Sequence, residues 1–294
     1  YKEVAINNNA QVFDITISGL LGGHSGMDID KGRGNANKIL ARILWKINKE
    51  IPIQLIQFDG GSLRNAIPRE ASAQIAVAID MDSNFKALLQ EDTLVIIEEF
   101  KTIEPNFKID LSPASAKGKA MDTEGFNSII NTLCAVHNGV FRMSPDIKGL
   151  VETSTSLARV IIKDGSFTTQ SLQRSSVEST KAEVAMAIRA CFELIGATVT
   201  QGGDYPGWKP NPSSNILQLM RDLYVNLFEE EPQVKACHAG LECGILGVHL
   251  PGVDMISFGP NIRAAHSPDE KVQISSVQKF WGFYLKTLAQ IPSN

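Results

Sequence analysis

Apolar and polar positions alternate along several short stretches of the chain, and this pattern predicts strands. It is clearest in residues 12–18 and 71–79, and residues 51–58 form a third such stretch that ends at a glycine pair. Between the first and third, apolar residues recur at the spacing of an amphipathic helix, at Ala36, Ile39, Leu40, Ile43, Leu44 and Ile47. With a second helix predicted around residues 84–100, the order β-α-β-β-α is typical of a split βαβ sandwich.

The pattern recurs in outline further along the chain. Residues 101–121 are polar and contain two prolines, so we interpret them as a connector between two lobes. A helix around residues 126–133, strands around 157–162 and 166–173, and a helix around 184–195 then predict a second lobe. This echo of the first lobe suggests an internal duplication, which we keep as a hypothesis.

The last third of the chain has a different pattern. A stretch rich in proline and glycine, residues 202–212, reads as a crossing between domains. Helical spacing predicts helices around residues 216–228 and 277–288. Between them, the β-rich run of residues 253–258 predicts a strand that stops at a Gly-Pro pair.

Composition excludes several classes of protein. The 294 residues are long enough for about two domains, and 28 basic against 32 acidic residues give a net charge of −4, which does not suggest a nucleic-acid partner. No apolar run approaches the roughly 18 residues of a membrane span. The four cysteines show no CxxC spacing, which favours reduced thiols and a cytoplasmic protein.

Three residues of the two lobes have a chemical and a purely structural interpretation. His24 lies in a glycine-rich turn, where glycines permit close approach to a ligand, but a turn histidine is often only solvated. Asn65 follows a glycine pair and either presents its amide to a ligand or forms an Asx turn. Arg174 lies at a predicted strand end, where its guanidinium either pairs with a carboxylate or stays in solvent.

The last third contains two further histidines of interest. His266 follows the predicted strand 253–258 by a short loop, a place where α/β folds often bind ligands, and imidazole is a common zinc donor. A loop histidine in water is the alternative. His238 and Glu242 are four residues apart among small residues such as Gly240, but the spacing H-E-x-x-H of a zinc peptidase is absent.

Several motifs together resemble one known family. They are Gly-Gly-His24-Ser-Gly, Gly-Asn35-Ala-Asn37-Lys, Gly-Gly-Ser-Leu-Arg-Asn65-Ala-Ile-Pro-Arg-Glu, Tyr205-Pro-Gly-Trp, His238-Ala-Gly-Leu-Glu-Cys-Gly and Gly259-Pro with His266-Ser-Pro-Asp-Glu. In this order they are similar to motifs of the aminoacylhistidine dipeptidases, a branch of the dinuclear-zinc peptidases that includes carnosinases. The resemblance extends from about residue 12 to the end of the sequence.

The resemblance implies an α/β fold in which an α+β lid is inserted into a zinc-peptidase catalytic domain. Residues 1–8 would end an N-terminal catalytic segment, and residues 9–200 would form a two-lobed lid of split βαβ sandwiches. Its lobes would span about residues 9–104 and 120–200. Residues 201–294 would be the C-terminal part of the catalytic domain, the only large part of it present.

One departure from the family affects the expected metal site. The family's other metal ligands and its catalytic base precede the lid, and none of those motifs occurs before residue 12. Only His266 matches a ligand, whereas a zinc ion needs about three or four protein donors. We therefore expect the sequence to be a fragment of a longer enzyme, inactive by itself.

For the complete enzyme, the resemblance implies hydrolysis of dipeptides, preferentially of aminoacyl-histidine, with two zinc ions per site or cobalt or manganese in their place. His24 would stabilise the oxyanion, Asn65 would bind the substrate, and Arg174 would hold its terminal carboxylate. His238, Gly240 and Glu242 would line the substrate site.

Two alternatives stay open: another metallo-dipeptidase or deacylase of the same superfamily, and a non-catalytic dimerisation module. The resemblance also implies a homodimer formed through the lid. We expect His24 to act on the site of its own chain, because the first lobe, which contains it, can take the place of a partner's lid; delivery from a partner subunit is the alternative.

Overall fold

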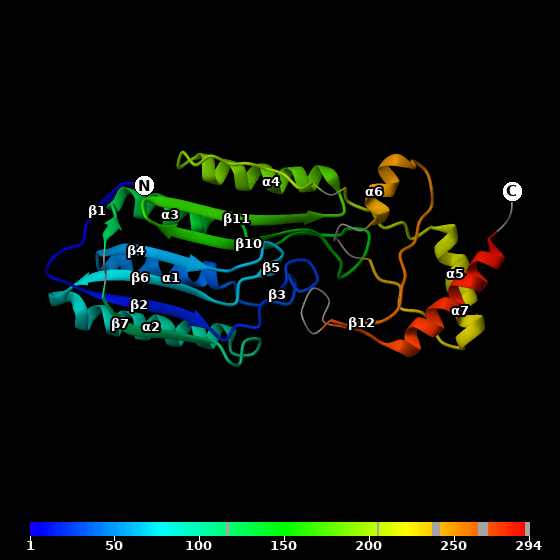
Figure 1. Ribbon diagram of the computed structural model, residues 1–294, viewed down its shortest axis with the longest axis horizontal. Coiled ribbons are helices and arrows are strands. Elements are labelled where there is room, and N and C mark those ends of the chain that lie inside the picture. The colour runs from blue at the N-terminus through cyan, green and yellow to red at the C-terminus, as the bar shows by residue number, and fades with distance from the viewer. Residues whose placement is uncertain (116–117, 205, 237–241, 264–269, 292–294) are drawn as a thin grey trace. The chain divides into compact units, whose positions relative to one another are not determined.

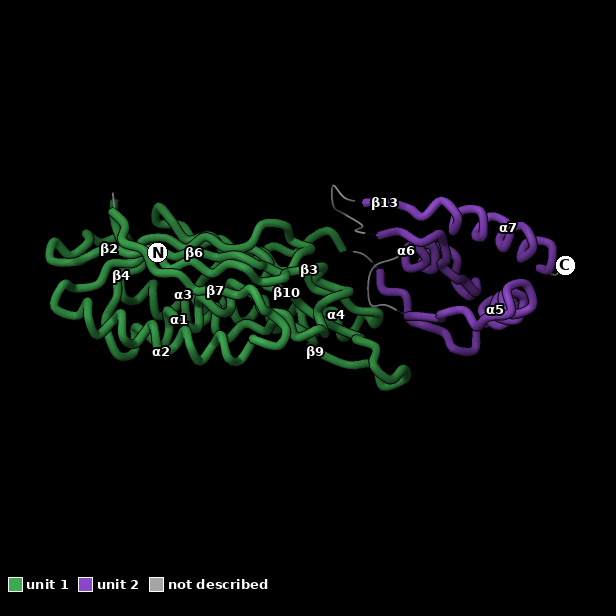
Figure 2. The backbone as a smooth tube through the Cα atoms, turned by 90° about the horizontal axis from the view of Figure 1, so that it is seen from below, with its two compact units in different colours: residues 1–204, 237–239 green, residues 205–236, 240–294 purple. Residues whose placement is uncertain are grey.

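The computed structural model describes residues 1–115, 118–204, 206–236, 242–263 and 270–291. These residues form two compact units, one within residues 1–204 and one within residues 206–291 (Figure 2). Each unit is described by itself. Among the described residues, no helix is long and apolar enough to cross a membrane.

Unit 1 is built on one seven-stranded antiparallel sheet with the order β11-β10-β4-β6-β2-β7, in which β9 also pairs with β10 (Figure 1). Its strands are β2 (Ala10–Ser18), β4 (Ile53–Gly60), β6 (Ala71–Ala78), β7 (Lys108–Ala114), β9 (Gly139–Met143), β10 (Val151–Lys163) and β11 (Ser166–Ser175). A separate pair joins β1 (Glu3–Ala5) to β8 (Lys119–Met121). We call residues 10–114 the first half and residues 119–193 the second half of unit 1. The first half has the strand order of a split βαβ sandwich, as its sequence pattern predicts.

Four helices cover one face of this sheet, and the main core lies between the two layers (Figure 2). They are α1 (Ala36–Glu50), α2 (Asp82–Phe100), which follows the short 3-10 helix Ile79–Met81, α3 (Thr123–Ala135) and α4 (Glu178–Glu193). The apolar stripe predicted on α1 is fully or almost fully buried, since it faces the sheet.

The start of α1 joins the two halves. Asn35 caps the helix by accepting from the N–H groups of Asn37 and Lys38. The side-chain amides of Asn35 and Asn37 both donate to the backbone oxygen of Leu157 in β10, at 3.1 and 3.2 Å. The Lys38 ammonium donates to the backbone oxygens of Leu133, Cys134 and Val136 at the end of α3, at 2.7–2.8 Å. Burial lowers the pKa of Lys38 below its usual value. The motif Gly-Asn-Ala-Asn-Lys is therefore a contact between halves.

Two sequence interpretations are wrong. Residues 101–121, interpreted as a connector, contain β7 and β8. Among the described residues, β7 pairs only with β2 and is an edge strand, so its alternation is weak and Pro113 is tolerated there. Residues 253–258, predicted to be a strand, are not one. A strand needs a partner, and the described residues of unit 2 offer this run none; Phe258 instead packs its ring against Phe280 and Phe283.

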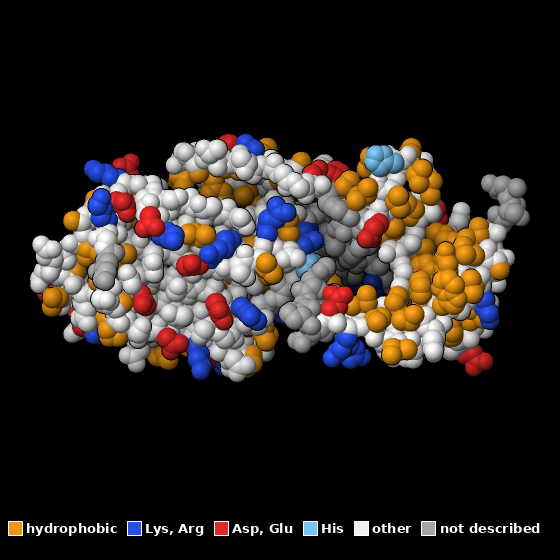
Figure 3. All heavy atoms as spheres, viewed as in Figure 1, with side chains coloured by type: hydrophobic (Ala, Val, Ile, Leu, Met, Phe, Trp, Pro, Cys, Tyr) orange, Lys and Arg blue, Asp and Glu red, His pale blue; other side chains and the backbone are white. Residues whose placement is uncertain are grey.

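The described residues of unit 2 form three helices and one short pair of strands. The helices are α5 (Asn215–Phe228), α6 (Glu242–His249) and α7 (Ile274–Gln290), and β12 (Ile262–Arg263) pairs with β13 (Lys271–Val272). Its core centres on Met220, Leu223 and Phe283. Apolar side chains gather on the surface over α5 and α7 (Figure 3); exposed ones on α7 are Ile274, Val277, Trp281, Leu285 and Leu288.

Candidate active site

The candidate site of unit 1 brings together a two-stranded flap and the end of a sheet strand. The flap pairs β3 (Gly23–His24) with β5 (Ala66–Ile67), so that His24 lies opposite Ala66. The backbone N–H of Ser25 donates to the backbone oxygen of Asn65 at 2.9 Å. Strand β11 contributes Arg174, which lies opposite Ser154 of β10. Two of the three predicted residues are thus next to each other on the flap, although they are far apart in sequence.

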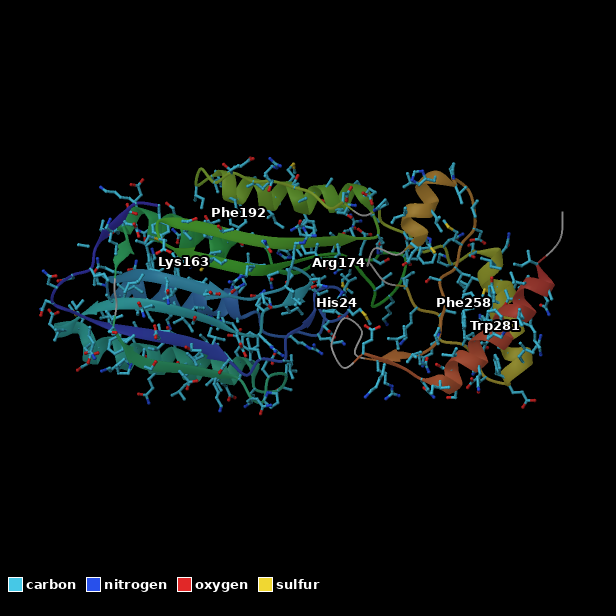
Figure 4. All side chains as sticks on the ribbon, in the orientation of Figure 1. His24, Lys163, Arg174, Phe192, Phe258 and Trp281 are labelled. Atoms are coloured by element: carbon cyan, nitrogen blue, oxygen red, sulfur yellow. The ribbon has the colours of Figure 1, made fainter. Side chains whose placement is uncertain are left out.

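His24 and Arg174 are in direct contact (Figure 4). Nitrogen Nη2 of Arg174 lies 3.3 Å from Nε2 of His24, and its Nε donates to the Ser25 hydroxyl at 3.3 Å. Arg174 is half-buried, so the alternative of a solvent-exposed strand end is wrong. The contact joins the first half of unit 1 to the second.

The hydrogen bonds of the imidazole indicate its tautomer. Nδ1 of His24 accepts from the backbone N–H groups of Gly26 and Met27, at 3.2 and 3.1 Å. A neutral imidazole has one acceptor nitrogen and one N–H donor. The two amide donors therefore place the ring hydrogen on Nε2, an assignment inferred from the network. Both the Nε2–H group and the Arg174 guanidinium are then donors, and an acceptor oxygen about 3 Å from each nitrogen could accept from both.

Charged residues fix the turn that follows His24. Asp28 accepts from the backbone N–H of His24 at 2.9 Å and forms ion pairs with Lys31 and Arg33. Arg33 in turn donates to the backbone oxygen of Gly22 at 2.6 Å. Burial by itself would raise the pKa of Asp28, but the hydrogen bonds from Lys31 and from the His24 N–H, with the charge of Arg33, outweigh it and lower this pKa.

Asn65 is placed next to His24 through its backbone. Among the described residues, its side-chain amide makes no hydrogen bond of the kind that defines an Asx turn, so that alternative is not observed. Sequence reasoning missed Ser25 and Asp28. The only signal for Asp28 was a run of charges in a glycine-rich turn, Asp28-Ile-Asp-Lys-Gly-Arg33.

The remaining predicted site residues lie in unit 2 or outside the described residues. Glu242 is exposed at the start of α6 in unit 2. His238, Gly240 and the predicted zinc ligand His266 lie outside the described residues. Within the described parts of the chain, no three His, Cys, Asp or Glu side chains come together in a way that could hold a metal ion. The described residues alone therefore do not fit a zinc site.

Comparison with known proteins shows that the chain is similar to peptidases. Residues 15–102 match the model of the M20 peptidase dimerisation domain. The chain is 39% identical over 289 residues to the cytosol non-specific dipeptidase of Escherichia coli (strain K12), covering 98% of the chain and 60% of that relative. The crystal structure of an aminoacylhistidine dipeptidase from Vibrio alginolyticus matches with 37% identity and a TM-score of 0.91, over 100% of this chain and 60% of that one.

These matches agree with the motifs. The chain spans about 60% of the length of both relatives. The mixed α/β fold expected from the resemblance is confirmed, because the structural match extends over the whole chain. The resemblance to the aminoacylhistidine dipeptidases is thus confirmed along the chain, and residues 15–102 match the M20 peptidase dimerisation domain.

Proposed function

We propose that the protein of which this chain is a part hydrolyses dipeptides, with aminoacyl-histidine as a preferred substrate. The observation that supports this function is the contact of His24 and Arg174, whose nitrogens lie 3.3 Å apart. His24 is within the residues that match the M20 peptidase dimerisation domain. A dipeptide has a terminal carboxylate and a scissile carbonyl, whose oxygen becomes negative in the transition state. Both are acceptors for groups of this kind.

The roles of the chain's own residues follow from their chemistry. The planar guanidinium of Arg174 binds the terminal carboxylate and so selects short substrates, since a longer peptide has an amide at that place. The Nε2–H of His24 donates to the oxyanion as it develops, and Asn65 holds the substrate nearby. Residues His238, Gly240 and Glu242 line the substrate site.

The proposal includes two zinc ions per site, or cobalt or manganese, with His266 as one ligand; when bound they supply an acidified water as the nucleophile. No step through these ions is assigned to the described residues, which do not form a metal site. Metal content of the purified whole protein tests this part. A protein without bound metal would favour a non-catalytic module.

The domain arrangement belongs to the same proposal. Residues 9–200 form a lid inserted in a catalytic domain, with lobes of about residues 9–104 and 120–200. Residues 1–8 and 201–294 belong to the catalytic domain. The dimerisation-domain match of residues 15–102 favours a homodimer through the lid. A cytoplasmic location agrees with the cytosol dipeptidase relative.

The experiment compares three substrate types with the whole protein: free Xaa-His dipeptides, their C-terminal amides and N-acyl amino acids. The proposal expects turnover of the free dipeptides, with amides much poorer. Preferred turnover of N-acyl amino acids would point to a deacylase of the same superfamily, and no turnover at all would reject the hydrolase.

A mixing experiment tests whether His24 and Arg174 act from one chain. Whole protein with His24→Ala is mixed with whole protein with Arg174→Ala under conditions of subunit exchange. If one site used His24 and Arg174 of different subunits, each mixed dimer would contain one intact site, and activity would recover to about a quarter of wild type. The intrachain contact leads us to expect no recovery.

A further inference from the structure

The segment that contains His24 is fixed at both of its ends by one buried carboxylate. We call residues 21–34 the His24 segment. Oxygen Oε2 of Glu104 accepts from the backbone N–H of Leu21 at 2.7 Å, and Oε1 accepts from the backbone N–H of Gly34 at 2.9 Å. Glu104 is only 2% exposed. A single side chain thus joins the first and last residues of the segment.

Burying a carboxylate is costly unless it is paired or well hydrogen-bonded. No Lys or Arg of the described residues forms an ion pair with Glu104, so its two backbone donors are its compensation. Hydrogen bonds to a charged acceptor are about twice as strong as neutral ones. Within the part of the chain that the structure describes, both hydrogen bonds of the Glu104 side chain go to this segment.

The backbone around Glu104 also fits the segment closely. A Cβ atom on Gly19 would lie 1.9 Å from the backbone oxygen of Asn106, and Gly19 has a φ of +74°. A Cβ atom on Gly34 would lie 2.8 Å from Cδ2 of Leu20. Only glycine permits the approach at Gly19. The chain just before the segment therefore packs tightly against the turn after α2.

Between these ends, the position of His24 depends on contacts within the segment and with the flap. Asp28 and β5 hold the backbone of His24, and Gly26 and Met27 orient its ring. None of these contacts ties the segment to the helices of unit 1. Glu104 provides that tie, because it ends the turn after α2 and its N–H donates to the backbone oxygen of Phe100, the last residue of that helix, at 2.8 Å.

We infer that Glu104 is a positioning residue, which keeps the imidazole of His24 at the distance from Arg174 that the reaction needs. This inference rests on the proposed hydrolytic function. Within the described residues, Glu104 makes no hydrogen bond to His24 or Arg174 and acts through the backbone of the His24 segment.

The kinetic test uses Glu104→Gln in the whole enzyme, because glutamine keeps the shape but turns an amide N–H towards a backbone donor. We expect a loss of roughly tenfold in kcat with KM nearly unchanged, since Arg174 lies on β11 and stays in place. In a His24→Ala background, Glu104→Gln should cause no further loss of kcat, because residues that act as a unit are not additive. Glu98→Gln, an exposed glutamate at the end of α2, is the matched control and should leave activity unchanged.

Two results would overturn the inference. One is an equal loss of kcat in the wild-type and His24→Ala backgrounds, and the other is a raised KM with an intact kcat. Either would make Glu104 a residue of general structural importance.

A second measurement does not depend on activity. Amide hydrogen exchange of the 294-residue chain should show faster exchange across residues 21–34 in Glu104→Gln, with the strands β2, β4 and β6 unchanged. Unchanged exchange in the segment would reject the positioning role. If the whole protein hydrolyses no dipeptide, the proposed function fails, while this measurement still decides the role of Glu104.

Discussion

The two halves of unit 1 supply the candidate site in different ways. The first half contributes His24 and Asn65 from a flap of two-residue strands that is separate from the main sheet. The second half contributes Arg174 from β11, a ten-residue strand paired with β10 along its length. The flap is held by side-chain bonds from Glu104, Asp28 and Arg33 to the backbone. Strand β11 is held by its backbone hydrogen bonds to β10.

This difference separates the residues that position the site from those that stabilise the fold. The place of Arg174 comes with the fold of the sheet, so few single substitutions would move it without unfolding the second half. The place of His24 depends on a handful of polar side chains that contribute little to the core. Substitutions near the flap should therefore change chemistry first, and substitutions at the junction of the halves should change stability first.

The largest effect is expected from His24→Ala. If the imidazole donates to the oxyanion, its removal lowers kcat by roughly 100- to 1,000-fold with KM little changed, because the bond forms only in the transition state. Steady-state kinetics on an Xaa-His dipeptide measure both constants. A raised KM with unchanged kcat would instead place His24 in substrate binding.

Arg174→Ala should have the next largest effect. Hydrogen bonds to charged groups are worth about 1.5–3 kcal/mol, so kcat/KM for a free dipeptide should fall about 10- to 100-fold. The C-terminal amide of the same dipeptide lacks the carboxylate, so its kcat/KM should be low with wild type and should fall little further with Arg174→Ala. If acid and amide lose equally, Arg174 supports the structure rather than the substrate.

Lys38→Met tests the junction between the halves. The substitution removes the ammonium group that donates to three backbone oxygens at the end of α3, at a cost of about 1–3 kcal/mol in the free energy of unfolding. Urea unfolding measures this cost. Lys49→Met, on the exposed side of the same helix, is the control and should be nearly neutral. An unaffected midpoint in Lys38→Met would show that the sheet alone holds the halves together.

The smallest effect is expected from Asp28→Asn, and it should depend on pH. The folded-state pKa of Asp28 is lowered, so its contribution is present above the unfolded value of about 3.9 and is lost as pH falls through the folded-state pKa. Urea midpoints followed into acid should fall less steeply for the variant than for wild type. Parallel curves would mean that Asp28 does not support the flap through its charge.

Sequence patterns predicted the regular elements of unit 1 well. The helix α1 and the strands β2 and β6 have many residues on one buried face, and such a repeat is visible without the partner. The predictions failed at the edge strand β7, which was missed, and at residues 253–258, which do not form the predicted strand. Both failures have one reason. Whether a short run becomes a strand depends on a neighbour that lies far away in sequence.

The candidate site was predicted residue by residue but not as an arrangement. Glycines around His24 and the strand end before Arg174 drew attention to both residues, yet no local pattern says that a side chain of β11 reaches the flap. Glu104 gave no signal at all, since a glutamate just after a helix is common at protein surfaces. That Glu104 is buried and accepts from two backbone N–H groups is visible only in the fold.

The short pairing of β4 with β10 has a consequence for synthesis on the ribosome. The strands of the first half emerge together, but Val160, the partner of Gly60, follows about 100 residues later, roughly 5–20 s at usual elongation rates. During that time the outer edge of β4 is open to other nascent chains. Asp59, whose charge later pairs with Arg159, lies on that edge strand and discourages such pairing. The Asp59 carboxylate, which pairs with Arg159 in the finished sheet, would thus first limit wrong strand pairing in the unfinished one.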